Sequence, residues 1–430
     1  MENRYFIEGI RIIANESSSE ALKEFGKEGF DVSGGNPTIS YFESMDDPNI
    51  SVEIKDVVDV DQFVSKLGLI GGESLALKVK FTQEGDTENK DFEITSDHKL
   101  ILNKISNVIT TSTKQLATLE FITQETLIDE TARLSKRFEG NIIDMVRDIL
   151  KKDKKGIKTT KKFNTQPRSL NPFKDSSFNI YTFVGNMKRP FDTIQWLAPK
   201  AATDDEDCGF LFFENYDGYN FRSIKTMIES KPIKKYTRVD STLYGEDSLN
   251  IVEARLNQTT DLGMNLRVGT YANKTIYINL ETAEKTVLDY KISENPGIKN
   301  PPKLPGDLDQ HPSRLMLRLI DPGAMQKGSK KDQEEREADL AKYQNKSYSR
   351  VNLLNSYSMN IEVAFSADLR VGDTIELRFP YKADEKTVKK GKSDFTDLSG
   401  IYLIKNLRHE IGNSKSATFL EIVRDTFSAK

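Results

Sequence analysis

The sequence predicts a mainly β fold with an α+β insertion, in which two antiparallel β-barrels arise by internal duplication. Three observations support this prediction. Short runs rich in Ile, Val, Phe and Thr, separated by Gly, Asp and Asn clusters, fill residues 5–121. Similar segments return in the same order near the C-terminus. Between the two sets, the apolar residues change from a period of two to the period of a helix.

The first element of the repeat is a turn that leads into a strand. Gly72–Phe81 reads "GESLALKVKF" and Gly372–Tyr381 reads "GDTIELRFPY". Both read Gly, acid, hydroxyl, aliphatic, any residue, Leu, basic and apolar, and the offset is 372 − 72 = 300. In each, a Gly-acid turn precedes alternating apolar residues, so turn chemistry and strand period agree. We therefore predict repeat-defining structural turns, which we list as Gly72, Glu73, Gly372 and Asp373.

The similarity extends to both sides of this strand. Upstream, Asn49–Ile54 parallels Met359–Phe365; downstream, Leu100–Thr123 parallels Ile401–Arg424. Three segments in one order at nearly one offset indicate an internal duplication of a small antiparallel β domain. The alternative is that all β-meanders resemble one another.

The C-terminal stretch 400–425 contains Arg408, His409 and Glu410 side by side, as a catalytic site could. Strand alternation sends His409 to the face opposite its two charged neighbours, so the three side chains do not converge. "GNSKS" then offers a turn before a second β-rich run, "ATFLEIV". We therefore expect a hairpin with solvated or interface charges. The face that includes His409 is expected to hold Ile401, Leu403, Leu407 and Ile411.

The middle of the chain reads as an α+β module. Glu139–Lys152 places Ile142, Val146, Ile149 and Leu150 on one helical stripe. A lysine-rich stretch, 151–162, follows; it could contact nucleic acid phosphates, but it is more often the polar end of a helix.

Two further elements are expected in this module. Pro190 opens a short helix, "PFDTIQWLA", which carries the one tryptophan, Trp196. Asp217 and Gly218 then form a two-residue hairpin signal between aromatic strands.

These signals give three expected domains. They are a first barrel at 1–125, an inserted α+β domain at 126–249, and a second barrel at 250–430. The second barrel carries a Pro-rich, charged insertion at about 292–349. Its part 328–349 is expected to be a solvated helix or an arm that orders on assembly.

The composition limits the function. With 430 residues, of which 37% are hydrophobic and 30% charged, the chain fits two or three soluble domains. A net charge of −4 argues against a protein whose whole surface binds nucleic acid or anionic lipid, so any basic site must be local. The single Cys208 excludes an internal disulfide and a multi-thiolate metal site. No apolar run of about 18 residues occurs, and we expect synthesis and folding in cytoplasm.

No signature of catalysis, metal binding or cofactor binding is present. "GLIGGES" and "GKS" (391–393) lack the full phosphate-loop pattern, and "DDEDCG" (204–209) has Cys208 at the last ligand position of a calcium loop. His98, His311 and His409 form no metal motif. The carboxylates of a glycosidase need only meet in space, so 66 acidic residues do not discriminate. We predict no catalytic residues, no metal and no cofactor.

Several stretches together resemble a known family. They are "PFDTIQWLAPKA", "GFLFFENYDGYNFRSI", "LRVGDTIELRF", "SGIYLIKNLRHEI" and "ATFLEIVRD". These fold-carrying patterns resemble the central baseplate hub protein of contractile-tailed bacteriophages, and through it the hub portion of type VI secretion spike proteins. The resemblance runs in order through most of the chain to Phe427 and is weakest in the first thirty-odd residues and in 295–349. Unlike type VI spike proteins, this chain ends at the second barrel.

The resemblance implies an assembly protein. Two tube-type β-barrels lie side by side, with the inserted domain outside. A homotrimer presents six similar barrels, so one face matches a sixfold tail tube and the other a threefold spike. The implied partners are the spike, tail tube or tube-initiator proteins, surrounding baseplate proteins, and phage DNA passing through the lumen without sequence-specific binding. The implied location is the virion tail baseplate. The alternatives are a tail-associated peptidoglycan hydrolase and the hub of a related injection or type VI secretion system.

Overall fold

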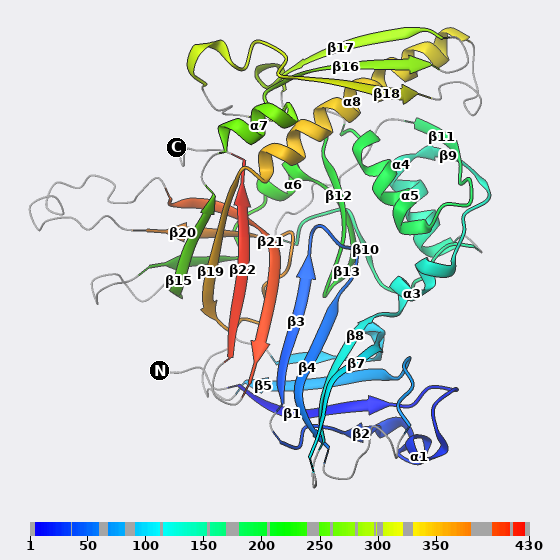
Figure 1. Cartoon of the computed structure of the whole chain (residues 1–430), viewed down its shortest axis with the longest axis vertical. Coiled ribbons are helices and arrows are strands. Elements are labelled where there is room, and N and C mark those ends of the chain that lie inside the picture. The colour runs from blue at the N-terminus through cyan, green and yellow to red at the C-terminus, as the bar shows by residue number, and fades with distance from the viewer. Residues whose placement is uncertain are drawn as a thin grey trace, which may run out of the picture.

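The structure is a computed structural model of the 430-residue chain (Figure 1). It describes residues 5–35, 37–59, 68–81, 91–111, 115–152, 155–168, 180–203, 207–238, 249–258, 261–279, 283–295, 298, 304–320, 330–379, 398–412 and 416–425. The turn predicted at 413–415, the "GKS" motif at 391–393 and the acidic residues 204–206 lie outside this part. Among the described helices, none is both long and apolar enough to cross a membrane.

The C-terminal part of the chain forms a closed barrel. Its six strands pair in the order β21, β20, β14, β15, β19 and β22, and β22 returns to β21. The predicted hairpin is thus confirmed as β21 and β22. The parallel strand β14 was assigned to the inserted domain by the sequence, but it closes this barrel between β20 and β15. The strands are β14 (Lys234–Thr237), β15 (Leu249–Gln258), β19 (Tyr357–Ala364), β20 (Thr374–Arg378), β21 (Gly400–Ile411) and β22 (Ser416–Arg424).

The N-terminal part repeats this arrangement without closing. Its strands pair in the order β1, β5, β7, β8, β4 and β3, with β2 on β1 and β6 on β5. The described residues show no pairing between β1 and β3. The predicted fold class, mainly β with an α+β insertion, is confirmed. The elements are β1 (Tyr5–Ile13), α1 (Glu20–Lys23), β2 (Phe30–Asp31), β3 (Thr38–Ser44), β4 (Ser51–Asp59), β5 (Ser74–Phe81), β6 (Phe92–Ile94), β7 (Leu100–Thr110) and β8 (Gln115–Thr123).

The pairing registers show which residues are equivalent in the two barrels. Leu102 pairs with Phe121, and Ile404 pairs with Ile422; in each case the next residue, Asn103 or Lys405, is an extra residue in a β-bulge. The bulge shifts the alternation within β21 by one. Tyr402 and Ile404 are therefore buried, as Leu407, His409 and Ile411 are. Ile401, expected on the face of His409, is exposed instead.

One upstream correspondence needs correction. Ile54 pairs with Leu119, and Ile361 pairs with Leu420, so Ile54 is equivalent to Ile361. The ranges compared in the sequence, Asn49–Ile54 and Met359–Phe365, align Ile50 with Ile361 when their shared Asn-Ile pairs, 49–50 and 360–361, are superposed. The difference is four residues, an even number, so each side chain keeps its face and the pattern alone could not reveal the shift.

The inserted domain carries the predicted helices and hairpin. Pro190 is the first residue of α5, as expected, and the stripe of Ile142, Val146, Ile149 and Leu150 is buried. The helix there begins at Ile142, not Glu139, because Asn141 caps it through a bond from the Ile143 N–H. The elements are α3 (Gln124–Thr131), β9 (Arg137–Asn141), α4 (Ile142–Arg147) with a π-turn at Asp148–Lys152, β10 (Phe163–Asn164), β11 (Ile180–Val184), α5 (Pro190–Leu197), β12 (Phe210–Asn215), β13 (Gly218–Ser223) and α6 (Ile224–Ile228).

A separate three-stranded sheet lies in the connection between β15 and β19. Strands β16 and β17 were expected in the second barrel, but they pair with β18 in the order β17, β16, β18. The insertion therefore begins before β16 and not at residue 292. The elements are α7 (Leu262–Val268), β16 (Ala272–Asn279), β17 (Lys285–Lys291), β18 (Arg314–Ile320) and α8 (Lys330–Leu354).

Helix α8 confirms the predicted helical character of the charged segment, but the second half of the helix is not solvated. Ala341, Tyr343, Leu353 and Leu354 are buried, because α8 packs beneath the three-stranded sheet and beside the inserted domain (Figure 1). Its apolar residues are thus structural.

One apolar core unites the two barrels. The buried cluster runs from Ile10 in β1 to Val423 in β22 and includes Phe213 of the inserted hairpin. A second cluster fills the inserted domain. The barrels therefore pack as one unit on a shared core.

Candidate assembly surface

The most prominent surface of the chain is a continuous antiparallel sheet that spans both barrels. Strands β7, β8, β4 and β3 of the first barrel continue into β21, β22, β19 and β15 of the second. The seam between the barrels is the pairing of β3 with β21, from Ser44 opposite Asn406 to Ile39 opposite Ile411. Because every neighbouring pair is antiparallel, β7 and β21 run in one direction, and β3 and β15 run in the other.

One face of this sheet is covered by the shared core. Tyr41 and His409, which are opposite each other in the seam, are buried and stack with ring centroids 5.8 Å apart. His409 Nδ1 shares a 2.9 Å hydrogen bond with the Thr418 hydroxyl. Burial, and then the charge of Arg370, lower the pKa of His409 well below its ordinary value. A neutral, packed imidazole fits a structural role, in agreement with the strand interpretation of the Arg408–Glu410 triplet.

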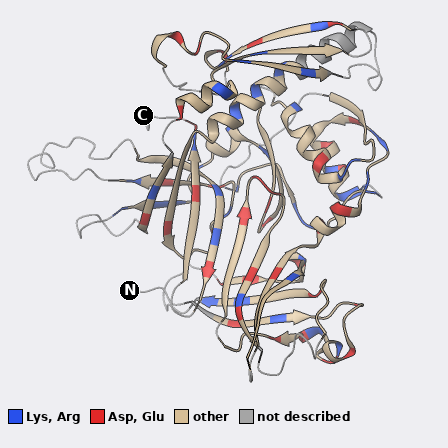
Figure 2. Ribbon diagram, in the orientation of Figure 1, with Lys and Arg blue, Asp and Glu red and all other residues tan. Residues whose placement is uncertain are grey.

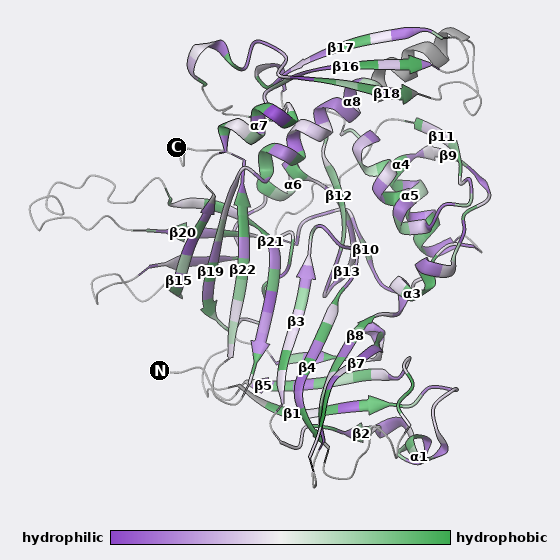
Figure 3. Cartoon of the chain, viewed as in Figure 1, coloured by the Kyte–Doolittle hydropathy of each residue, from purple (hydrophilic) through white to green (hydrophobic). Residues whose placement is uncertain are grey.

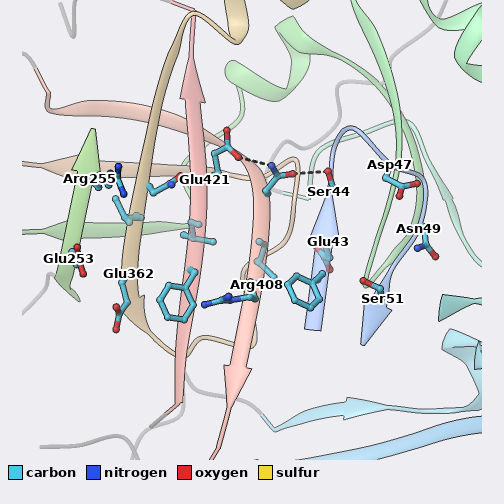
Figure 4. A pocket seen from close by; sticks show the side chains of 17 residues that line it. Glu43, Ser44, Asp47, Asn49, Ser51, Glu253, Arg255, Glu362, Arg408 and Glu421 are labelled. Atoms are coloured by element: carbon cyan, nitrogen blue, oxygen red, sulfur yellow. Dashed lines mark hydrogen bonds between the residues drawn. The ribbon is translucent and has the colours of Figure 1, made fainter. Parts of the chain in front are cut away.

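The other face is open and forms a groove of about 650 Å³ across the seam (Figure 4). Asn406 lies at its centre, where its Nδ2 donates to Glu421 at 2.7 Å and its Oδ1 accepts from Ser44 Oγ at 2.7 Å. Arg408 pairs with Glu410 at 3.1 Å, and its guanidinium lies 4.3 Å from the Phe419 ring centroid. The groove is thus held by contacts within one chain.

The groove contains more acidic than basic side chains. Arg255 and Arg408 are the basic residues among those that line it. The strands around them carry both signs (Figure 2). None of the residues that line the groove belongs to the lysine stretch 151–162. The acidic residues that line it are Asp47, Glu253, Glu362 and Glu421, together with Glu43, whose side chain is buried on the opposite face of the sheet.

The two predicted Gly-acid turns have the same backbone geometry. Gly72 has a φ of 86°, its N–H donates to Leu102 O at 2.7 Å, and the Leu102 N–H donates to Glu73 O at 2.7 Å. Gly372 has a φ of 85°, its N–H donates to Ile404 O at 3.0 Å, and the Ile404 N–H donates to Asp373 O at 2.9 Å. Glycine is favoured at both positions because φ is positive.

The acidic side chains of these turns differ in their partners. Glu73 accepts hydrogen bonds from the Ile70 and Gly71 N–H groups of its own turn, at 3.1 and 2.9 Å. Asp373 accepts from Arg168 of the inserted domain at 2.6 Å. The second turn thus anchors a domain that the first turn does not contact.

The aromatic hairpin is confirmed, but its turn is shifted by one residue. Asn215 pairs with Gly218, so the loop residues are Tyr216 and Asp217. Gly218, with a φ of 118°, is the first residue of β13; a Cβ there would lie 2.5 Å from Lys162 O. This turn inserts between the barrels, because the Tyr216 N–H donates to Glu43 of β3 at 2.7 Å.

Sequence reasoning missed a buried ionic cluster between the first barrel and the inserted domain. Lys161, from the stretch expected to be polar, lies 2.6 Å from Glu214 and 3.2 Å from Glu125. Thr123 Oγ1 donates to Glu214 at 2.9 Å. Burial raises the pKa of Glu214 to about 7. These residues are far apart in sequence, so no local signal could have found the cluster.

Among the described residues, no group of three His, Cys, Asp or Glu side chains is arranged to hold a metal ion. Cys208 is buried next to Ala202 and Tyr343 and forms no disulfide.

The sheet ends at two strand edges that lack a full partner within the described chain. On the outer edge of β7, the neighbouring strand β5 pairs with β7 only at Ile101. On the outer edge of β15, the neighbouring strand β14 pairs with β15 only at Leu249 and Asn250. Both edges expose apolar side chains: Val108 and Ile109 on β7, and Val252 and Leu256 on β15. Open strand edges with exposed apolar residues are typical of sites for further strand pairing.

Comparison with known proteins shows which other proteins share this architecture. No protein-family model matches the sequence, and no curated protein sequence matches it. The fold matches that of a tail protein from Neisseria meningitidis MC58, with a TM-score of 0.54 and 10% identity over 99% of this chain and 98% of that chain. The chain shares the fold of phage tail proteins.

A second solved structure agrees. The 43 kDa tail protein of prophage MuSo2 from Shewanella oneidensis has a TM-score of 0.50 and 10% identity, over 98% of this chain and 99% of that chain. The predicted resemblance to phage tail proteins is therefore confirmed at the level of the fold. Because both alignments span nearly the whole of each chain, the phage-tail fold extends over the inserted domain and both barrels.

Proposed function

We propose that this protein is the structural central hub of a phage tail baseplate, a homotrimeric ring of pseudo-sixfold symmetry that joins a sixfold tail tube to a threefold spike. The observation that supports it best is the seam between β3 and β21, because it supplies a template for contact between copies. By register, β3 is equivalent to β15, and β21 is equivalent to β7. The seam between barrels is satisfied within the chain, whereas β15 and β7 lack a full partner among the residues that the structure describes.

Repeating the seam between copies closes a ring. In the ring, the rotation that superposes the first barrel on the second also superposes the second barrel on the first barrel of the next copy. The β3–β21 seam then becomes a pairing of β15 with β7 of the next copy. Within the seam, Glu410 lies opposite Ser40. The equivalent pair between copies is Ile109 of one copy opposite Arg255 of the neighbouring copy. Each contact covers the exposed apolar residues of both edges, which favours association.

In such a ring, the groove face lines the lumen. Its acidic excess would repel DNA phosphates and would not hold them, as passage of duplex DNA requires. The lumen must be roughly 20 Å wide or more for a duplex to pass. The lysine stretch 151–162 lies on the outer side in this arrangement. Surrounding baseplate proteins would contact the outer surface, and the assembled protein would reside in the virion tail.

The repeat turns at Gly72, Glu73, Gly372 and Asp373, and the hairpin turn at Asp217 and Gly218, are structural in this proposal. The first four hold equivalent strands in the two barrels, and the last two place the inserted domain against the seam. We divide the domains by the barrel strands. The first and last strands of each barrel, and not residue 249 or 292, mark the limits of each repeat.

A cross-link tests the ring. In a Cys208→Ser background, Ile109→Cys and Arg255→Cys together should give covalent trimers under mild oxidation, because directly opposite Cβ atoms are about 5 Å apart. The matched control is Ile70→Cys with Arg255→Cys, since Ile70 is exposed but belongs to neither β7 nor β15. Covalent trimers only in the first variant support the proposal. Monomers in both variants, together with a monomeric mass of the unaltered protein, contradict it.

The competing functions have separate tests. For a tail-associated peptidoglycan hydrolase, purified protein is incubated with cell-wall peptidoglycan; turnover that disappears on replacement of one Asp or Glu would overturn the structural proposal. The hub of a type VI secretion or other injection system would have the same ring but would associate with a secretion spike, so purification of assembled particles with this chain distinguishes the two settings.

A further inference from the structure

The outer face of the three-stranded sheet β17–β16–β18 carries a row of exposed leucines; in Figure 3 the apolar residues of these strands are green and alternate with hydrophilic ones. Leu315, Leu317 and Leu319 of β18 are 66%, 67% and 63% exposed. Ile276 of β16 lies beside them, because it pairs with Leu317 on one side and with Val287 of β17 on the other. Isolated exposed apolar residues are ordinary, but a contiguous row on one face marks an interaction site.

The side chains of β18 alternate between the two faces of the sheet, and its leucines face outward. In an unbound protein, a strand at this exposed position would be expected to turn its charged side chains outward. In the run "RLMLRLI", Arg314 and Arg318 face the protein, where Arg314 Nη1 donates to Tyr348 Oη of α8 at 3.2 Å. Arg318 lies 5.7 Å from the Tyr348 ring centroid. A sheet with one solvated face normally turns charges outward and apolar residues inward. Here the chain places the leucines outward.

Helix α8 covers the inner face of this sheet. Tyr277 Oη donates to Ala341 O at 2.9 Å, and Asn273 Nδ2 donates to Ser349 Oγ at 3.1 Å. Because α8 lies between the sheet and the barrels, the open face points away from the barrels (Figure 1).

The position of the sheet in the chain decides which neighbour can reach it. The ends of β7 and β21 that lead to β8 and β22 lie at one end of the joint sheet, here called the hairpin end, since β7 and β21 run in the same direction. The opposite end carries the connection from β3 to β4 in the first barrel and the connection from β15 to β19 in the second. The first is the short stretch 45–50, and the second contains the three-stranded sheet.

Because of this difference, the two ends of a trimeric ring would have different symmetry. The hairpin end presents two equivalent strand pairs in each chain, β7 with β8 and β21 with β22, so a ring of three would present six. The other end presents one three-stranded sheet in each chain, so the ring would present three. A neighbouring copy in the ring lies beside the β7 and β15 edges and not beyond the end of the strands. The occupant of the apolar face is therefore a different molecule, stacked on this end.

We propose that the outer face of the β17–β16–β18 sheet, centred on Leu315, Leu317 and Leu319, is the docking surface for an apolar face of a threefold spike-type protein. The number three rests on the proposed trimeric ring. The tube then binds the hairpin end. On this face Lys274 and Asp289 form an ion pair 3.2 Å apart, and Lys285 lies at its end opposite Ile278, so the leucines form the apolar part of the surface.

The test uses the full-length protein and the purified trimeric spike protein of the same particle. First, native mass spectrometry of the chain alone establishes whether the ring forms, which decides the proposed function separately. Spike binding is then measured for the unaltered chain, for Leu315→Ser/Leu317→Ser/Leu319→Ser, and for the control Ile70→Ser, which removes an equally exposed residue elsewhere.

We expect three spike chains per ring of three, affinity about tenfold weaker or more in the triple variant, and unchanged affinity in the control. Amide hydrogen exchange of the unaltered complex should show protection within 314–320, which keeps the test valid if the triple variant misfolds. The proposal is overturned if the unaltered ring does not bind the spike or if all three proteins bind the spike equally. It is also overturned if two rings of this chain bind each other through the leucine face and the triple variant abolishes that association instead.

Discussion

The backbone N–H of Val371 donates a 2.8 Å hydrogen bond to Oε2 of Glu43, 328 residues earlier in the chain. The other carboxylate oxygen accepts from the Tyr41 hydroxyl at 2.8 Å and from the Tyr216 N–H at 2.7 Å. One buried side chain of β3 thus joins the first barrel, the inserted hairpin and the loop that precedes β20. Burial raises the pKa of Glu43, although these donors and Arg370 oppose the rise.

Glu43→Gln should destabilise the protein strongly. The amide NH₂ would face an N–H donor and leave a buried group unsatisfied, at a cost of about 2–3 kcal/mol in the free energy of unfolding. Urea denaturation measures the change, and Glu16→Gln, at an exposed position, is the matched control. Equal stability of both variants would show that the three contacts do not hold the domains together.

The stability of the junction between the first barrel and the inserted domain should depend on pH through Glu214. Its pKa is about 7 in the folded protein and near 4.5 when unfolded, so the native state binds more protons between these values. The contribution of this group is therefore fully present below about pH 4.5 and is lost as pH rises through 7. Relative to Glu214→Gln, the unaltered protein should lose on the order of 3 kcal/mol across this window. Unfolding free energies of both proteins at each pH measure it; a constant difference would contradict the assignment.

The two equivalent turns should differ in their sensitivity to substitution. Gly72→Ala and Gly372→Ala both place a side chain at a positive φ, which costs about 1 kcal/mol or more. At Gly372 the new Cβ would also lie 2.6 Å from the Phe213 ring, whereas at Gly72 the nearest atom, 2.8 Å away, is the end of the Asn15 side chain.

We therefore expect Gly372→Ala to be the more destabilising by about 1–3 kcal/mol, because a packed ring yields less easily than an amide tip. Thermal unfolding compares the two variants. Gly34→Ala is the control, since its Cβ would meet nothing within 4 Å. The reverse order would mean that the core around Phe213 is loosely packed.

Like charges at the open edges should prevent assembly without unfolding the chain. Ile109→Lys places an added lysine directly opposite Arg255 of the neighbouring copy in the proposed contact, while the position is exposed in the single chain. Sedimentation should then report monomers with an unchanged circular dichroism spectrum. Ile70→Lys, at an exposed position outside β7 and β15, should still form trimers.

The parts of the fold that the sequence predicts are those with strong local signals. The hairpin at 400–425, the Gly-acid turns and Pro190 at the start of α5 each depend on a few adjacent residues. The repeat also predicts the shared strand order, because similar side chains return at one spacing.

Other features depend on partners distant in the chain. The strand β14, only Lys234–Thr237, has no alternating pattern and becomes a strand because β20 and β15 flank it. The cluster of Lys161 with Glu125 and Glu214 requires three segments to meet. The exposure of Leu315, Leu317 and Leu319 could not be predicted, since alternation gives two faces but not which one is covered.

The extra residues Asn103 and Lys405 bear on the ancestry of the protein. They occupy the same place in two equivalent strands, as they would if an ancestral barrel already carried the bulge before the duplication. An ancestor with a single barrel would have met its neighbours along the strand edges now represented by β3 and β21. The seam that joins the two halves of the chain is in that case a former boundary between molecules, fixed when two genes became one.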